Sequence, residues 1–108
     1  MYIFVREDLS PGQIIVQACH AVAESARHFL SKEDEHPHFV ICGVKNENLL
    51  KNAYSKIIEQ NIKAKSFIEP DIGDQMTAFA TEPVCNEQRR IFRKYKLLKP
   101  KIPIIEAI

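Results

Sequence analysis

The chain has 108 residues and a mass of 12.4 kDa, the usual size of one domain, and its 45% hydrophobic and 27% charged residues are typical of a folded globular protein. This composition excludes a disordered chain, a collagen-like repeat and a disulfide-rich miniprotein, and no apolar run approaches the ~20 residues of a membrane-spanning helix. The formal net charge is +1, but it is unevenly placed: residues 89–108 carry seven basic residues and one acidic residue, whereas residues 1–88 carry eight basic and thirteen acidic residues.

The N-terminal part of the chain reads as a strand followed by a long helix. Residues 2–5 are a continuous apolar run of β-branched and aromatic residues, which is the pattern of a strand buried on both faces. Ser10 is a good N-cap with a proline directly after it and Gln13 three positions on, so we predict a helix from Ser10 to about Leu30. With Ser25 as the one other exception, its polar residues form a single stripe: Gln13, Gln17, His20, Glu24, Arg27, His28 and Ser31. We expect this stripe alone to face solvent.

Three further strands and two helices follow. Residues 39–44 read as a second buried strand, and Asn46 caps a helix that ends near Asn61. Residues 64–68 and 76–81 read as the third and fourth strands. Asn86 then caps a last helix, which is followed by a tail with two prolines.

The element order predicts the fold class. A β-α-β-α-β-β-α chain places crossover helices between the first three strands, which makes these strands mostly parallel, while the short link before the fourth strand allows it to run antiparallel. We therefore predict an α/β fold, a single three-layer domain over residues 1–108, with a four-stranded mixed sheet and helices on both faces. Its basic C-terminal helix and tail span residues 86–108.

The three cysteines, Cys19, Cys42 and Cys85, lack the spacing of a disulfide framework or a zinc site. Each is predicted to be a small buried apolar group. The N-terminus shows neither a basic leader nor a cleavage site, so we expect a cytoplasmic protein.

Polar residues gather where the parallel strands end. Ligands of open α/β sheets bind beyond the carboxyl ends of these strands, which places residues 6–8, the start of the first helix and residues 69–74 at one rim. Gln13, Gln17 and His20 would face this rim as a polar ladder, in which the histidine can act as a general base. The alternative is that Gln13 completes the helix cap and His20 is a partly buried, hydrogen-bonded structural residue. The spacing alone favours that alternative.

The loop after the third strand carries three carboxylates, Glu69, Asp71 and Asp74. They can raise one another's pKa or bind a divalent cation, or they can simply make turns through bonds to nearby backbone N–H groups. Neither a Gly-x-Ser-x-Gly nucleophile elbow nor a glycine-rich phosphate loop is present in the sequence.

Two stretches of the chain match a known pattern. Residues 5–9 read Val-Arg-Glu-Asp-Leu and residues 12–21 read Gly-Gln-Ile-Ile-Val-Gln-Ala-Cys-His-Ala, while residues 75–80 read Gln-Met-Thr-Ala-Phe-Ala. Together they resemble the type 2 (archaeal and eukaryotic) peptidyl-tRNA hydrolase family, which has an Arg-x-Asp-Leu turn, an Ala-Gln-x-x-His-Ala helix and a late threonine-bearing strand. The element order agrees too, so the likeness spans nearly the whole chain. It is strongest to the divergent branch called peptidyl-tRNA hydrolase domain-containing.

The resemblance implies an activity and its substrate. It implies metal-free and cofactor-free hydrolysis of the ester bond that joins a peptide, or an N-acyl amino acid, to the 3′ end of tRNA. Gly12, Gln17, His20 and Thr77 match the family pattern, but Gln13 stands where the family has a catalytic lysine. Lys65 and Glu69 stand where it has an aspartate and a threonine.

These departures leave two hypotheses open. Either an altered esterase site works through His20, Glu69 and Thr77 with Gln17 and Gln13, or the fold is a non-catalytic homologue that binds tRNA or a protein. A basic tail near such a site would suit the tRNA backbone, and its predicted RNA contacts are Arg89, Arg90, Arg93, Lys94 and Lys96. Relatives imply a homodimer, although no exposed apolar stripe in the sequence demands one.

Overall fold

Four strands and four helical segments alternate along residues 1–99, the part of the chain that the computed structural model describes. Their bounds are β1 (Tyr2–Arg6), α1 (Pro11–Phe29), β2 (Val40–Val44), α2 (Glu47–Glu59), β3 (Ala64–Glu69), the 3₁₀ helix η1 (Pro70–Ile72), β4 (Gln75–Thr81) and the 3₁₀ helix η2 (Asn86–Phe92). The predicted order of four strands and the first two helices is confirmed, and the ends of these six predicted elements lie within two residues of the observed ones. The 3₁₀ helix η1, between β3 and β4, was not predicted.

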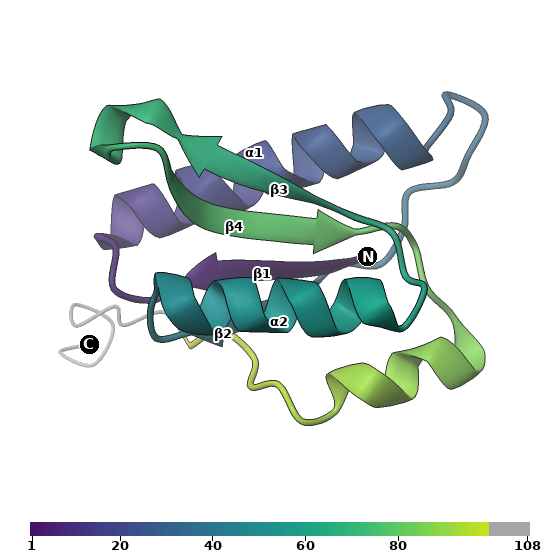
Figure 1. Ribbon diagram of the computed structural model, residues 1–108. Helices are drawn as coiled ribbons and strands as arrows, with labels where there is room; N and C mark the ends of the chain where they lie inside the picture. Colours follow the sequence, from purple (N-terminus) through teal and green to yellow (C-terminus); the bar gives the residue numbers. More distant parts are fainter. Residues whose placement is uncertain (100–108) are drawn as a thin grey trace, which may run out of the picture.

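The four strands form one mixed sheet in the order β2-β1-β4-β3. Strand β1 is parallel to β2 and antiparallel to β4, and β3 is also antiparallel to β4. The first three strands therefore share one direction, as predicted. Helix α1 covers one face of the sheet, and α2 with η2 covers the other (Figure 1). The predicted three-layer α/β fold is confirmed.

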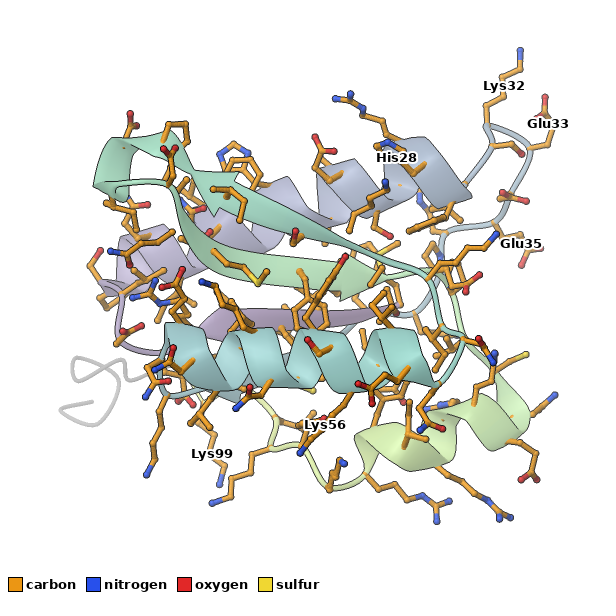
Figure 2. The ribbon with its side chains drawn as sticks, viewed as in Figure 1. His28, Lys32, Glu33, Glu35, Lys56 and Lys99 are labelled. Atoms are coloured by element: carbon orange, nitrogen blue, oxygen red, sulfur yellow. The ribbon has the colours of Figure 1, made fainter. Side chains whose placement is uncertain are left out.

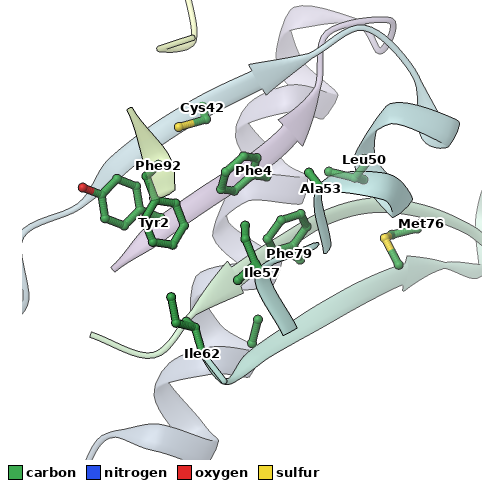
Figure 3. Packing of buried hydrophobic residues seen from close by; sticks show 11 residues of the cluster. Tyr2, Phe4, Cys42, Leu50, Ala53, Ile57, Ile62, Met76, Phe79 and Phe92 are labelled. Carbon is green, nitrogen blue, oxygen red and sulfur yellow. The ribbon is translucent and has the colours of Figure 1, made fainter. Parts of the chain in front are cut away.

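Each face of the sheet has its own hydrophobic core. Successive residues of β1 point to opposite faces, so Tyr2 and Phe4 face α2 whereas Ile3 and Val5 face α1. On the α2 face, Phe4 stacks on Phe79 with ring centroids 4.6 Å apart, and Tyr2 stacks on the ring of Phe92 at 3.8 Å (Figure 3). Small residues dominate the other core, where Ala18, Ala21, Ala78 and Ala80 let α1 lie close to the sheet.

The solvent-facing side of α1 differs from the prediction. Gln17 is only 1% exposed, whereas Ile15 is 66% and Val16 is 45% exposed. The reason is that α1 is the sole helix on its face among residues 1–99, so it contacts the sheet along one side and leaves its other side uncovered. The expected polar stripe is therefore wrong at Gln17, and an exposed apolar strip exists where none was expected.

The last predicted helix is also corrected. Asn86 was expected to cap an α-helix, but it is the first residue of a 3₁₀ helix, has φ = 53° and follows Cys85, whose side chain makes no capping bond. Only Phe92 of η2 is buried, and so short an apolar anchor does not support an amphipathic α-helix. The remainder of the predicted tail, residues 100–108, lies outside the described residues.

The residues after η2 return to the sheet at the edge of β2. The N–H of Gly43 donates to the carbonyl of Lys96 at 3.1 Å, and the N–H of Leu98 donates to the carbonyl of Ile41 at 2.9 Å. This short antiparallel contact covers the edge of β2, which would otherwise offer unpaired backbone groups to another chain.

The cysteines divide into one buried and two exposed residues. Cys42 is 1% exposed, and burial raises the pKa of its thiol to about 11. Cys19 and Cys85 are exposed, so the prediction that all three are buried is wrong for these two. Over residues 1–99, no helix is long and apolar enough to cross a membrane.

Candidate active site

The amide of Gln17 is the centre of a hydrogen-bond network between α1 and the sheet. The hydroxyl of Thr77 donates to Gln17 Oε1 at 2.6 Å, and Gln17 Nε2 donates to Gln13 Oε1 and to Glu69 Oε1, both at 3.0 Å. Gln17 and Thr77 are 1% and 0% exposed. Because the oxygen and both N–H groups of this buried amide have partners, its orientation is fixed.

Helix α1 brings two residues of this network, Gln13 and Gln17, together. Gln13 and Gln17 are four residues apart on α1, so their side chains lie on the same side of the helix. Ser10 caps the helix by accepting the N–H of Gln13, whose side chain turns to Gln17 and not back to the cap. The expected capping role of the Gln13 side chain is therefore wrong.

A β-bulge shapes the site from the side of β4. Phe67 lies opposite Ala78 and Ile68 lies opposite Met76, so the pairing between β3 and β4 skips Thr77. Bulges of this kind redirect one side chain and are frequent near active sites. Here the skipped residue is the one that bonds to Gln17, and Glu69 closes the network from the last position of β3.

His20 flanks this network without joining its bonds. It lies one turn after Gln17 on α1, is exposed, and stacks on the ring of Phe67 with centroids 4.4 Å apart and planes 11° apart. The alternative that His20 is a partly buried structural residue is therefore wrong, because its side chain is exposed. Four of the five predicted site residues form one network, and the fifth, His20, lies beside it on α1.

A buried arginine ties the end of β1 to the start of β4. Arg6 is 7% exposed and donates to both carboxylate oxygens of Asp8, at 2.8 and 2.9 Å, and to Gln75 Oε1 at 2.7 Å. The bidentate bond from Arg6 lowers the pKa of the Asp8 carboxyl, and the same bond raises the pKa of Arg6. Sequence reasoning placed Arg6 at this rim but missed its partner Gln75, although the Arg-x-Asp spacing signals the bond to Asp8.

Asp8→Asn is expected to make the protein slightly less stable and less sensitive to acid. The pKa of Asp8 is depressed in the folded state, so its ion pair stabilises the protein above the ordinary value near 3.8 and is lost as the pH falls through the folded-state value. Because the Asp8 side chain is 39% exposed, we expect a loss of about 1 kcal/mol or less at pH 7. Urea unfolding at pH 7 and pH 3 measures this difference in the free energy of unfolding. We expect the difference between the wild type and Asp8→Asn to shrink at pH 3. An equal difference at both pH values would contradict a stabilising ion pair.

The other two carboxylates of the predicted acidic loop do not join the network. Asp71 lies in η1 and Asp74 just before β4, and both are exposed. Gly73 and Asp74 have φ values of 76° and 57°, which turn the chain back into β4. Within residues 1–99 no group of three His, Cys, Asp or Glu side chains converges as metal ligands would. Asp71 and Asp74 therefore lie in the turn between β3 and β4, apart from Glu69, and among residues 1–99 neither side chain accepts a hydrogen bond from a backbone N–H.

Four of the five predicted RNA contacts lie in the segment that packs on the α2 face of the sheet, and Lys96 lies at the edge of β2. All five, Arg89, Arg90, Arg93, Lys94 and Lys96, are exposed. The segment begins beside β1, where Arg89 Nε donates to the hydroxyl of Tyr2 at 3.2 Å, and it ends where the carbonyl of Lys96 meets Gly43. Gly43 pairs with Val5, the neighbour of Arg6. Only the Lys96 end therefore approaches the rim that bears the site.

The comparison with known protein families gives one match. The family model described as Peptidyl-tRNA hydrolase PTH2 matches residues 1–98. No match was found among curated proteins. The matched stretch includes the whole Gln17 network, His20 and the five basic residues just described.

Proposed function

Since the chain belongs to the Peptidyl-tRNA hydrolase PTH2 family, we propose that it hydrolyses the ester bond between tRNA and a peptide or N-acyl amino acid through an altered active site. The observation that carries this proposal is the network in which Gln17 holds Thr77, Glu69 and Gln13 together. A cytoplasmic location is part of this proposal, since ribosomes make its substrate.

Glu69 is the base in this proposal. One carboxylate oxygen, Oε1, accepts from Gln17, and this bond orients the group so that Oε2 can accept a proton from a water molecule. The water oxygen then attacks the ester carbonyl carbon. Its proton goes to Glu69, and the carbonyl oxygen becomes an oxyanion.

Gln13 and His20 act on the other two reacting groups, which are the carbonyl oxygen of the ester and the ribose 3′ oxygen. The exposed amide of Gln13 can donate an N–H to the oxyanion, where the family lysine would offer a full positive charge. When the intermediate collapses, the bond to the ribose 3′ oxygen breaks, and this oxygen takes up a proton that His20 donates. Glu69 then gives its proton to solvent water and His20 takes one up from solvent, which restores both side chains. The products are a free peptide acid and deacylated tRNA, and each step uses only side chains and water.

The exposed basic segment supplies the tRNA contact in this proposal. Five cations within eight residues would neutralise backbone phosphates, with an affinity that falls steeply as the salt concentration rises. Because its Lys96 end approaches the rim, tRNA bound along the segment would extend toward the ester site.

A non-catalytic homologue that binds tRNA or a protein is the second candidate function. The observation that favours it is the complete burial of Thr77 and the internal pairing of Gln17, since neither group presents a free polar atom to a substrate. This candidate predicts salt-sensitive tRNA binding that is indifferent to His20→Ala, and no hydrolysis.

Gln13→Lys tests the altered site. We expect the variant to release N-acyl amino acid from charged tRNA at least tenfold faster than the wild type, because an ammonium group stabilises the oxyanion better than an amide and the loss of one such donor typically costs about 10²–10³ in rate. Gln88→Lys, an exposed residue of η2, is the control for added positive charge. If Gln13→Lys and Gln88→Lys accelerate release equally, the gain comes from a higher affinity for tRNA and not from the altered site. If neither the wild type nor Gln13→Lys hydrolyses the substrate, the esterase proposal is wrong and the non-catalytic binding function is favoured.

A further inference from the structure

A cleft with a basic lining opens between the last turn of α2 and the segment that follows β4. It has a volume of about 470 Å³. Lys56 of α2 lines one wall, and Arg90, Arg93 and Lys94 line the other. Figure 2 shows Lys56 on the side of α2 that is turned toward η2, far from Lys32 in the loop after α1.

We propose that this cleft binds a phosphate of the RNA backbone and that Lys56 is part of the RNA contact. The proposal rests on the tRNA binding proposed above and adds to it a residue from another element and a defined place. The basic segment, residues 89–96, places positive charges on one wall of the cleft only, whereas Lys56 adds a positive charge from α2 on the opposite wall.

The charges of the cleft favour an anion. Four cations face one carboxylate, Glu59, and the negative end of the α2 dipole, which amounts to about half a charge. Within residues 1–99, Lys56, Arg93 and Lys94 make no ion pair. Arg90 is bound only to Glu87 at 3.4 Å, and both side chains are mostly exposed, so this pair is weak and open to exchange. The excess positive charge is therefore free for a ligand.

The shape of the cleft suits a phosphate with its sugar. The lining includes Ile57, Ile91 and Tyr95, whose apolar surfaces can contact a ribose, while Lys94 lies 5.4 Å from the centre of the Tyr95 ring. Two arginines on one wall can each offer paired N–H groups to phosphate oxygens. Lysine and arginine side chains make most of their contacts with nucleic acids through phosphate oxygens, which favours a contact of this cleft to the backbone.

The test is the salt dependence of binding to a fluorescently labelled RNA hairpin that carries no ester. Lys56→Gln and Arg93→Gln are each expected to weaken binding by about threefold to tenfold at 0.1 M salt and to reduce the slope of log K against log salt by roughly 0.7–0.9. Lys32→Gln, the same charge change in the loop after α1, is expected to leave both quantities unchanged. All three residues are exposed, and thermal unfolding verifies that the variants remain folded.

The outcomes distinguish RNA binding in the cleft from RNA binding by the basic segment and from ester hydrolysis. If Lys56→Gln and Arg93→Gln bind like the wild type while Lys96→Gln does not, the cleft proposal is wrong and the basic segment keeps its role. If all variants, Lys32→Gln included, lose the same affinity, the effect is net charge and the cleft is again wrong. Because the hairpin has no ester, none of these results depends on hydrolysis.

Discussion

Glu69→Gln is expected to lower kcat/KM for hydrolysis of N-acyl aminoacyl-tRNA by about 10²–10⁴-fold, the usual contribution of a general base. Glutamine keeps the size of the side chain, and its Oε1 can still accept from Gln17 at the end of β3. What it cannot do at neutral pH is take up the proton of the attacking water. The change therefore removes the proposed base and retains the network that positions it.

The controls for this prediction come from the same chain. Glu33→Gln makes the identical substitution at an exposed position in the loop after α1 and is expected to retain the wild-type rate (Figure 2). RNA binding by Glu69→Gln is expected to be unchanged, since the basic segment lies on the other face of the sheet. A variant that hydrolyses at the wild-type rate would remove Glu69 from the reaction.

Gln17→Ala is expected to lower the free energy of unfolding by about 2–4 kcal/mol. The substitution empties a fully buried site and leaves the Thr77 hydroxyl, itself 0% exposed, without its acceptor. It also frees Glu69 and Gln13 from their common partner, so hydrolysis is expected to fall together with stability.

Urea unfolding measures this loss, and Gln88→Ala at an exposed position of η2 is the control, with an expected change within about 0.5 kcal/mol. A Gln17→Ala variant less than 1 kcal/mol below the wild type would mean that water replaces the missing amide and that the network does not rigidify the site. The double variant Gln17→Ala with Thr77→Val refines the measurement: it removes the unsatisfied hydroxyl and is expected to recover part of the lost stability.

The sheet and its two main helices could be predicted because their signals are local. Ser10 and Asn46 cap α1 and α2 as expected, with N–H groups three residues on bonded to their side chains. The apolar run of residues 2–5 became β1, which is buried along its whole length. The prediction of a second buried strand over residues 39–44 is wrong in its burial, because β2 lies at the edge of the sheet, only its Cys42 is buried, and Phe39 is 53% exposed. The short link between β3 and β4 favoured the antiparallel pairing. These features depend on neighbouring residues, which a sequence displays directly.

The burial of Gln17 could not be predicted, because it depends on partners 52 and 60 residues away in the chain. A glutamine among apolar residues looks like a solvent-facing position until Glu69 and Thr77 are placed beside it. The bulge at Thr77 and the pairing of residues 96–98 with the edge of β2 also depend on contacts between segments far apart in the chain. The family resemblance named Gln17 and Thr77, whereas the bond between them emerged only from the fold.

The measurement that tests the central claim most directly is the multiple-turnover release of N-acyl amino acid from charged tRNA by the wild-type protein and by Glu69→Gln, followed side by side at one salt concentration. If the Gln17 network is an esterase site, the wild type releases many equivalents of product above the rate in buffer, and Glu69→Gln falls back toward that rate. Release by both proteins at the same rate, or by neither, would contradict the account.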